Sequence, residues 1–327
     1  MGEISKGVIE KCKSDLDKVK AEVAKAVVGQ EKVVDALIKA LLANGHVLVE
    51  GIPGIAKTLV IRSLASAISC KFKRIQFTPD LLPTDIIGIT SYEETKGFFV
   101  IKGPIFSNFV LADEINRAPP KVQSALLEAM QEKQATIGME TFPMDLPFFV
   151  MATQNPIETL GTYALPDAQI DRFLFKTRME YPAKEEEKKI IENNITLRMF
   201  DDYKIRSVLT QSRILELQEI TKDIAHSDKI KEYIVDIVSA TRFPDKFGIK
   251  AGKYIERGSS PRACIGLFIA AKADALMYGG SYIRPQHVKN VAYDVLRHRI
   301  ILNYTGQAEG VGTEAVIKEI LSKVPIP

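Results

Sequence analysis

Cysteine and histidine are scarce in this chain of 327 residues, and their positions exclude several kinds of site. The three cysteines, Cys12, Cys70 and Cys264, are far apart and odd in number, and no C-x-x-C pair occurs. This spacing indicates neither a disulfide framework nor a zinc site. The four histidines show no metal-ligand spacing either. We therefore expect a protein of the reduced cytoplasm.

Long apolar runs and a strong excess of one charge are also absent. No apolar stretch reaches the roughly 18 residues that a membrane span needs, and the N-terminus lacks the apolar segment of a signal peptide, so we expect no membrane insertion. The net charge of +3 is small for this length, which argues against a dedicated nucleic-acid binder. Hydrophobic residues at 46% and charged residues at 26% are typical of globular proteins. The length suits two domains, or one large domain with an appendage.

The most informative stretch is HVLVEGIPGIAKT, residues 46–58. A β-branched apolar run ends in a turn rich in glycine and proline, and an amphipathic helix then begins at Lys57 and Thr58. Backbone N–H groups in such a loop, together with the helix dipole, bind phosphate. Lys57 is expected to contact the β- and γ-phosphates, and Thr58 to bind Mg²⁺. For the short match alone, an ordinary strand-to-helix turn with a surface lysine is the alternative.

The sequence predicts the backbone conformation at three positions of this loop. Gly51 and Gly54 are expected to allow backbone geometry that a side chain would obstruct. Ala56 stands where the pattern G-x-x-x-x-G-K-[ST] has its last glycine. We expect a negative φ at Ala56, where a methyl group is tolerated, and hence a variant loop.

A break in helical periodicity precedes this loop. Apolar residues recur at helical spacing over 9–43, and the pattern is interrupted near Val28-Gly29-Gln30. Such a segment, just before a phosphate-loop strand, can receive an adenine ring. Taken alone, it is better interpreted as a simple joint between two helices.

Two later strands end in polar side chains. The run 109–114 ends in Asp113 and Glu114, which are placed to hold Mg²⁺ and to polarise the attacking water, respectively. The run 148–156 ends near Asn155, whose amide can bond the γ-phosphate or the water. Alone, the carboxylate pair is a solvated turn, and Asn-Pro is a common turn dipeptide. The upstream phosphate loop makes the functional interpretation more specific.

The remaining segments define the organisation of the chain. Residues 78–106 are too long for a plain connection and indicate an inserted hairpin or loop that projects from the core, and residues 134–147 indicate a second hairpin. A further strand is expected through 173–175. Beyond residue 182 the pattern becomes helical throughout, over 190–197, 214–224, 230–241, 261–278 and 287–299. Ser260 and Pro261 form a helix start with Arg262 in its first turn.

Together these motifs resemble the AAA+ ATPases, and more closely their MoxR branch. The resemblance extends from about residue 28 to 300. It is carried by Gly51–Thr58, Asp113–Pro119, Ala152–Pro156, Leu165–Phe173 and Ser260–Ala263. Ala56 and Asp167 depart from the commonest pattern, but neither removes a group that the chemistry requires.

The resemblance implies roles for individual residues. The expected catalytic residues are Lys57, Glu114, Asn155 as sensor 1, Arg172 as arginine finger and Arg262 as sensor 2. Thr58 and Asp113 are expected to bind Mg²⁺. The expected ATP contacts are Val28, Gly29, Gly51, Ile52, Pro53, Gly54, Ile55, Ala56, Lys57, Thr58 and Leu59. From the residues alone, Arg172 is equally a partner of Asp171, and Arg262 a solvated arginine.

The resemblance also implies the fold and the assembly. We expect a parallel sheet of five strands in the order 5-1-4-3-2 within an α/β domain of residues 1–182, followed by an all-helical lid of residues 183–327. The resemblance further implies a ring, mostly hexameric, that remodels or activates other proteins, often with a von Willebrand factor A partner.

Two other functions remain open from the sequence. One is a DNA or RNA motor, because Lys96, Lys102 and Lys133 lie in or near the two predicted hairpins. The acidic residues Glu93, Glu94, Glu132 and Glu140 offset them, so nucleic acid ranks second. The other is a scaffold that binds ATP without hydrolysis, against which Glu114, Asn155 and Arg172 argue.

Overall fold

A computed structural model describes residues 4–52, 54–95, 97–156, 161–193 and 199–327. The chain forms two compact units. One comprises residues 15–173 and 177–216, and the other comprises the chain up to residue 14, residues 174–176 and residues 217–327. We call the first the α/β unit and the second the helical unit.

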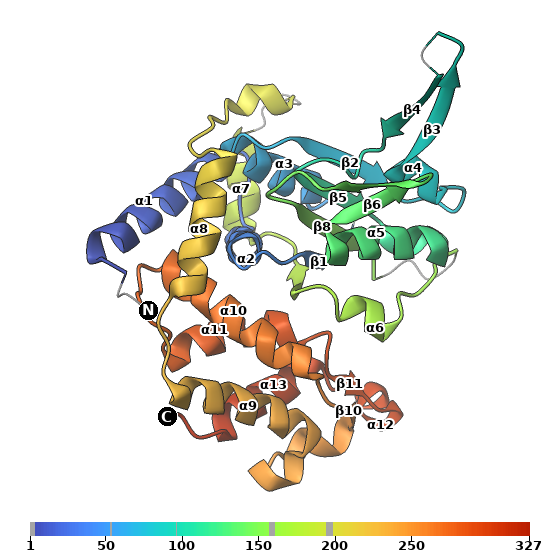
Figure 1. Cartoon of the computed structure of the whole chain (residues 1–327). Helices are drawn as coiled ribbons and strands as arrows, with labels where there is room; N and C mark the ends of the chain where they lie inside the picture. The colour runs from blue at the N-terminus through green and yellow to red at the C-terminus, as the bar shows by residue number, and fades with distance from the viewer. Residues whose placement is uncertain (1–3, 53, 96, 157–160, 194–198) are drawn as a thin grey trace. The chain divides into compact units, whose positions relative to one another are not determined.

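A five-stranded sheet has the order β2-β5-β8-β1-β9 (Figure 1). Its strands are β1 (Val47–Gly51), β2 (Phe72–Gln76), β5 (Phe109–Asp113), β8 (Phe149–Gln154) and β9 (Phe175–Met179). The pairs β1–β8, β5–β8 and β2–β5 are parallel. Numbered along the chain, these five strands stand in the order 5-1-4-3-2, which confirms the predicted fold. Every residue of β5 is buried, as expected for an inner parallel strand.

The last strand begins later than predicted. We expected it through 173–175, but β9 starts at Phe175. Phe173 still donates its backbone N–H to the Ile170 carbonyl over 3.1 Å, so the turn after α6 (Asp167–Ile170) continues to that point.

Helices flank the sheet (Figure 1). They include α2 (Glu31–Leu42), α3 (Lys57–Ala67) and α5 (Pro120–Glu132), while α1 (Lys6–Val23) precedes them and α7 (Lys184–Asn193) follows β9. A short 3₁₀ turn, η1 (Ile115–Arg117), joins β5 to α5. Leu126 of α5 packs in one buried cluster with Val110 and Val150 of the sheet. The interruption predicted near residue 29 lies between α1 and α2.

Two hairpins lie in the α/β unit. The first follows α4 (Pro83–Ile87) and consists of β3 (Gly88–Glu93) and β4 (Gly97–Lys102), paired antiparallel; it projects from the body of the unit (Figure 1). The second consists of β6 (Gln134–Ile137) and β7 (Glu140–Pro143).

The base of the first hairpin is tightly packed. A Cβ added at Gly88 would lie 2.2 Å from the Ile101 carbonyl oxygen, and one at Gly103 would lie 2.4 Å from the Ile86 carbonyl oxygen. Gly103 also donates its N–H to the Ile87 carbonyl over 2.8 Å. Side chains cannot be added here without moving the backbone, so both positions require glycine.

The C-terminal part of the chain is mainly helical. The 3₁₀ turn η2 (Phe200–Tyr203) precedes α8 (Gln211–Asp223). After α8 come α9 (Asp228–Arg242), α10 (Pro261–Met277), α11 (Pro285–Leu296), α12 (Tyr304–Ala308) and α13 (Thr313–Lys323), with the 3₁₀ turns η3 (Pro244–Phe247) and η4 (Lys250–Tyr254). The expectation of helix alone missed a two-stranded sheet of β10 (Ile255–Arg257) and β11 (Ile301–Leu302). These strands are too short to show a two-residue alternation.

The predicted helix over 190–197 lies partly outside the described residues, and α7 ends at Asn193. Among the helices that the structure describes, none is long and apolar enough to cross a membrane.

His46 fixes the start of β1 within the α/β core. Its Nδ1 accepts the Val150 backbone N–H over 3.1 Å, and its Nε2 lies 3.2 Å from the Met130 carbonyl oxygen. A carbonyl can only accept and an N–H can only donate, so Nε2 carries the proton and the ring is neutral. Burial lowers the pKa of His46 from 6.5 to about 4.

The low pKa of His46 predicts a loss of stability in mild acid. Below about pH 6.5 the unfolded chain binds a proton that the folded chain refuses until about pH 4, so the free energy of unfolding falls across this range. For this residue we expect a loss of about 2 kcal/mol between pH 7 and 5. Urea unfolding at both pH values measures it. His46→Gln, which cannot titrate, should lose correspondingly less, and equal losses in both proteins would contradict the assignment.

Candidate active site

The glycine loop joins β1 to α3. Gly54 has a φ of +83°, in the left-handed region that favours glycine. Gly51 is needed for space, because an added Cβ would lie 2.6 Å from Ile55 Cδ1 and 3.1 Å from Met179 Cβ. Gly54 is thus favoured by its backbone conformation, and Gly51 by the limited space around it. Pro53 lies outside the described residues.

Ala56 does not have the predicted backbone conformation. We expected a negative φ, but φ is +66° and ψ is 24°. An L-residue with a Cβ in this region is strained by roughly 1–2 kcal/mol relative to glycine. The backbone at residue 56 therefore has the left-handed conformation that favours glycine, the residue of the general pattern. Alanine adopts this conformation only under strain.

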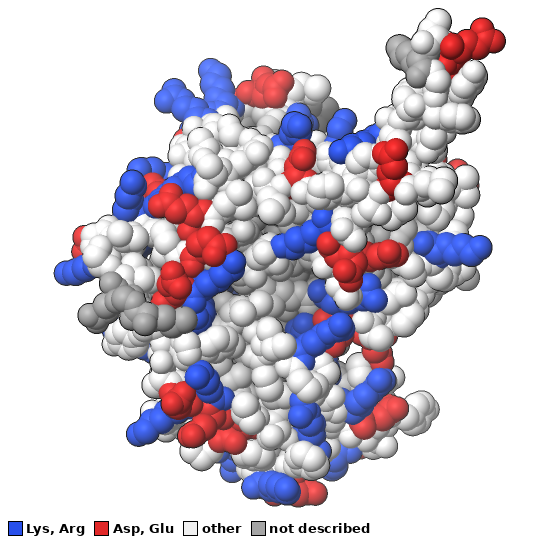
Figure 2. Space-filling view, in the orientation of Figure 1, with Lys and Arg blue, Asp and Glu red and all other residues white. Residues whose placement is uncertain are grey.

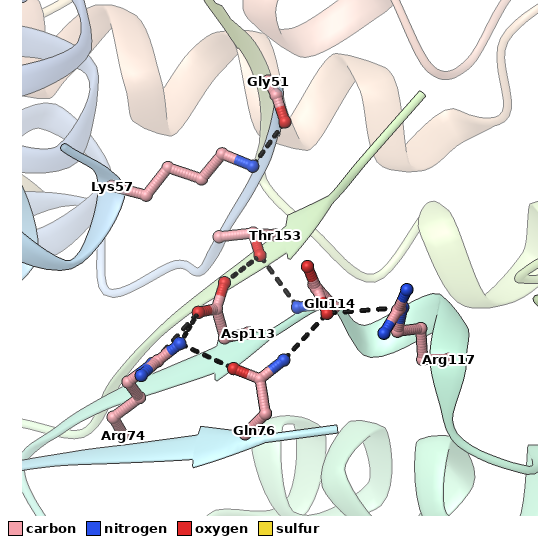
Figure 3. A network of polar contacts seen from close by, with 8 residues as sticks. All are labelled: Gly51, Lys57, Arg74, Gln76, Asp113, Glu114, Arg117 and Thr153. Atoms are coloured by element: carbon pink, nitrogen blue, oxygen red, sulfur yellow. Dashed lines mark hydrogen bonds and ion pairs between the residues drawn. The ribbon is translucent and has the colours of Figure 1, made fainter. Parts of the chain in front are cut away.

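The first turn of α3 presents polar groups to the loop. The helix begins at Lys57, and among the described residues no side chain caps it. The first turn of a helix carries backbone N–H groups without an intrahelical partner, which can bind an anionic ligand. The Lys57 ammonium donates to the Gly51 carbonyl at the other end of the loop (Figure 3). Thr58 and Leu59 are half-buried in the same turn, as is Ile52 in the loop.

Two carboxylates stand where β5 ends (Figure 3). Asp113 Oδ2 accepts two hydrogen bonds from Arg74, over 3.0 Å from Nε and 2.7 Å from Nη2. Asp113 Oδ1 accepts the Thr153 hydroxyl over 2.7 Å. Glu114 has a φ of +58°, which turns the chain sharply after the strand. Its Oε2 accepts Gln76 Nε2 over 2.8 Å and lies 3.4 Å from Arg117 Nε.

Thr153, in β8, connects the two acidic residues. Its hydroxyl donates to Asp113 Oδ1 and accepts the Glu114 backbone N–H over 2.9 Å. The side chain is completely buried. Asn155 follows β8 by one residue and is buried too.

Sequence reasoning missed four residues of this cluster: Arg74, Gln76, Arg117 and Thr153. Each signal was present but unspecific. Arg74 and Gln76 are polar residues two apart in a short strand, Arg117 follows the carboxylates by a few residues, and Thr153 is two residues before Asn155. The roles of Arg74, Gln76 and Thr153 depend on strand register, which a single sequence does not give. Arg117 contacts Glu114 within the turn that follows β5.

The segment proposed for adenine lies against the chain after β9. Gly29 has a φ of +74°, and an added Cβ would lie 2.7 Å from Glu186 Oε2 and 3.1 Å from Pro182 Cβ. Gln30 donates its side-chain amide to the Glu180 carbonyl over 2.9 Å. Val28 is half-buried beside them. The segment between α1 and α2 thus makes defined contacts with residues 180–186 and is more than an interruption between two helices.

The two arginines expected at the site belong to different units. Arg172 is exposed, and its Nη1 donates to the Leu127 carbonyl of α5 over 3.2 Å. It lines a surface cavity of about 410 Å³ with Gln169 and Glu128. Arg262 belongs to the helical unit, where it is exposed in the first turn of α10.

The oxygen donors of the site suit Mg²⁺, which prefers carboxylate, hydroxyl and water ligands. Within the described residues, the two Asp113 oxygens accept three hydrogen bonds, which leaves about one of four lone-pair positions for a further ligand. Thr58 supplies a hydroxyl in the first turn of α3.

Comparison with known proteins decides the family. Residues 46–175 match the ATPase family associated with various cellular activities (AAA), and residues 250–320 match the AAA lid domain. The chain is 47% identical over 315 residues to Chaperone MoxR1 of Mycobacterium tuberculosis, covering 95% of this chain and 82% of that protein. The chain belongs to the MoxR family of AAA ATPases. The resemblance inferred from the motifs is thereby confirmed.

Other relatives of this MoxR-family ATPase match over similar lengths. It is 30% identical over 326 residues to Protein MoxR of Methylorubrum extorquens, covering 94% of this chain and 93% of that protein. A Cytophaga hutchinsonii crystal structure, described as that of a candidate ATPase, is 46% identical with a TM-score of 0.90, covering 98% of this chain and 97% of that chain. Membership in this family means that the protein binds and hydrolyses ATP.

Thr153 provides a test of the carboxylate cluster. Thr153→Val leaves the Glu114 N–H and one Asp113 oxygen without their partner, so we expect the protein to lose about 1–3 kcal/mol of stability and most of its ATPase rate. Thr153→Ser keeps the hydroxyl and serves as the control. Unfolding midpoints and steady-state ATP hydrolysis measure both effects. A valine variant as active as the serine variant would contradict this role.

Ala56 provides a test of loop strain. Ala56→Gly removes the strain of a left-handed alanine, which is only partly offset by the greater flexibility of glycine in the unfolded chain, so stability should rise by up to about 1 kcal/mol. Ala56→Val should lower both stability and nucleotide affinity, because a β-branched residue tolerates positive φ poorly. Thermal unfolding and titration with a fluorescent ATP analogue measure the series. Equal values for the glycine and valine variants would show that the loop is unstrained.

Proposed function

We propose that this ATPase remodels or activates other proteins, working as a ring of identical copies. The observation that carries the proposal is the exposure of Arg172. This residue belongs to the same unit as the glycine loop and the carboxylates of β5, yet its side chain is exposed and donates to the Leu127 carbonyl of α5. An exposed arginine of a neighbouring copy can complete the site, so that hydrolysis depends on assembly.

The proposed reaction is in-line attack of water on the γ-phosphate of ATP. Glu114 orients the water and takes its proton, while the bond from the γ-phosphorus to the β–γ bridging oxygen breaks and ADP leaves. Lys57 neutralises the β- and γ-phosphate oxygens, Asn155 holds the γ-phosphate or the water, and Arg172 of the next copy stabilises the transition state. Arg262 is proposed to contact the nucleotide from the lid.

Thr58 and Asp113 would hold Mg²⁺, which when bound supplies positive charge at the phosphate oxygens. The remaining nucleotide contacts are proposed as backbone N–H groups of the loop and of the first turn of α3, with adenine at Val28 and Gly29.

A protein client is supported by the projecting hairpin. Tyr92 and Phe98 are 61% and 79% exposed although their rings lie 5.1 Å apart, and Ile89 and Ile101 are also exposed. Exposed apolar side chains gathered on one element are typical of protein contacts. The chaperone name of the Mycobacterium tuberculosis relative agrees with this interpretation.

Nucleic acid is a poorer candidate ligand. Lys102 lies 5.0 and 4.9 Å from the centres of the Phe106 and Phe142 rings, and Lys133 donates to Asn44 Oδ1 over 2.7 Å. Lys96 lies outside the described residues. Figure 2 shows acidic side chains at the tip of the β3–β4 hairpin and both charges interspersed elsewhere on this face.

A mixing experiment tests the shared site. Glu114→Gln should lower hydrolysis by about 10²–10⁴-fold while ATP binding persists, and Arg172→Ala by about 10³–10⁵-fold. In an equal mixture, an Arg172→Ala copy can supply Glu114 to a site completed by Arg172 of a Glu114→Gln copy, so activity should partly return. The native rate per molecule should also rise with protein concentration.

Arg284→Ala, which removes another exposed arginine, is the matched control and should keep the native rate. An Arg172→Ala protein that hydrolyses ATP at the native rate, independent of concentration, would overturn the shared site and with it the ring.

A further inference from the structure

Helix α5 lies between the carboxylates of β5 and the segment that carries Arg172. It follows the turn η1, which begins directly after Glu114. Residues 163–172, which include α6 and end in Arg172, lie along this helix (Figure 1). The chemistry proposed above assigns no role to any residue of α5.

Three side-chain hydrogen bonds join this segment to α5. They connect Gln123 with the Tyr163 carbonyl over 3.1 Å, Ser124 Oγ with Gln169 Nε2 over 3.4 Å, and the Leu127 carbonyl with Arg172 Nη1 over 3.2 Å. A guanidinium group has five N–H donors, and within the described residues Leu127 accepts from one of them. Arg172 therefore keeps donors for a phosphate group while its segment is attached to α5.

Gln123 makes the buried contact among these three. Its side chain is completely buried, and its Nε2 donates to the Ile115, Ala118 and Tyr163 carbonyls over 3.2, 3.0 and 3.1 Å. Carbonyl oxygens only accept, so the amide must turn its nitrogen toward them. One side chain thus connects the turn after Glu114 to the start of the segment that carries the arginine.

Packing alone does not account for a glutamine at this position. Its Oε1 is buried and has no hydrogen-bond partner among the described residues. A buried oxygen without a partner destabilises the folded protein, and methionine would fill a similar volume without one. What the amide adds is a defined position of Tyr163 relative to η1.

The backbone of Tyr163 is bonded to this turn at both of its polar groups. Besides the bond from Gln123 to its carbonyl, its N–H donates to the Asn116 carbonyl over 2.6 Å. Glu114, in contrast, is held from other strands, by Thr153 of β8 and Gln76 of β2. Loss of the Gln123 amide should therefore loosen the segment of Arg172 more than it disturbs Glu114.

We propose that Gln123 is a positioning residue of the ATPase reaction: it holds residues 163–172 against α5 and thereby fixes Arg172 for the site of the next copy. This inference rests on the proposed function, in which Arg172 completes a neighbouring site. It predicts that a change at Gln123 impairs a copy that supplies the arginine and spares a copy that supplies Glu114.

Mixed assemblies separate these two contributions. The arginine-supplying copies carry Glu114→Gln, and the glutamate-supplying copies carry Arg172→Ala. Gln123→Met is added to one kind of copy or to the other, and hydrolysis is measured at protein concentrations at which the rate per molecule no longer rises. The rate that mixing restores should fall about 10-fold in the first case, a part of what an arginine finger contributes, and stay within about twofold in the second.

Gln134→Met, which changes an exposed glutamine at the start of β6, is the matched control and should leave the restored rate unchanged in either kind of copy. Unfolding midpoints identify a variant whose slow rate arises from misfolding. If Gln123→Met does not fold, Gln123→Asn makes the same comparison, because its amide is one methylene too short to keep all three carbonyl contacts.

The outcomes distinguish this inference from the proposed function. A restored rate that is unchanged by Gln123→Met in the arginine-supplying copy, or lowered equally in both kinds of copy, would overturn the positioning role while the parent mixture stays active. No restored rate in the parent mixture of Glu114→Gln and Arg172→Ala would instead overturn the shared site.

Discussion

The parallel pairing of β5 between β2 and β8 is the constraint on which the site depends. Because the three strands run in one direction, their carboxyl ends meet, and each delivers polar side chains there: Gln76 from β2, Asp113 from β5 and Thr153 from β8. Side chains alternate along a strand, so a slip of one residue in β2 would turn Arg74 and Gln76 away together. The apolar core that fixes the register therefore also aligns the polar groups.

Two residues of the candidate active site, Ala56 and Glu114, have strained backbone conformations. Ala56 and Glu114 both have positive φ values, of +66° and +58°. One stands at the entry to the phosphate-loop helix, and the other directly follows β5. Such conformations cost about 1–3 kcal/mol each and persist where surrounding structure holds them. At Glu114 two hydrogen bonds stabilise this conformation: the Thr153 hydroxyl accepts the Glu114 N–H, and the Gln76 amide donates to the Glu114 carboxylate.

Much of the fold and the principal loop could be predicted from the sequence, because strong local patterns specify them. The apolar runs of β1, β5 and β8 and the glycine loop are such patterns, and the strand order followed from the family resemblance. The φ of Ala56 was predicted wrongly, since one residue's identity does not reveal the conformation its neighbours impose. The partners of the carboxylates could not be predicted either, because Arg74 and Thr153 approach Asp113 only through the pairing of distant strands. The strands β10 and β11 were too short to leave a pattern.

The two glycines at the base of the β3–β4 hairpin, Gly88 and Gly103, determine where the sequence of the hairpin can change. Gly88 and Gly103 admit no side chain, whereas the turn between the strands begins with the exposed residues Glu94 and Thr95. Substitutions near the tip therefore alter which partner the hairpin contacts without disturbing the five-stranded sheet or the carboxylates. The tip is a suitable place for a fluorophore or an affinity label, while a single methyl group at Gly88 or Gly103 would force the backbone to move.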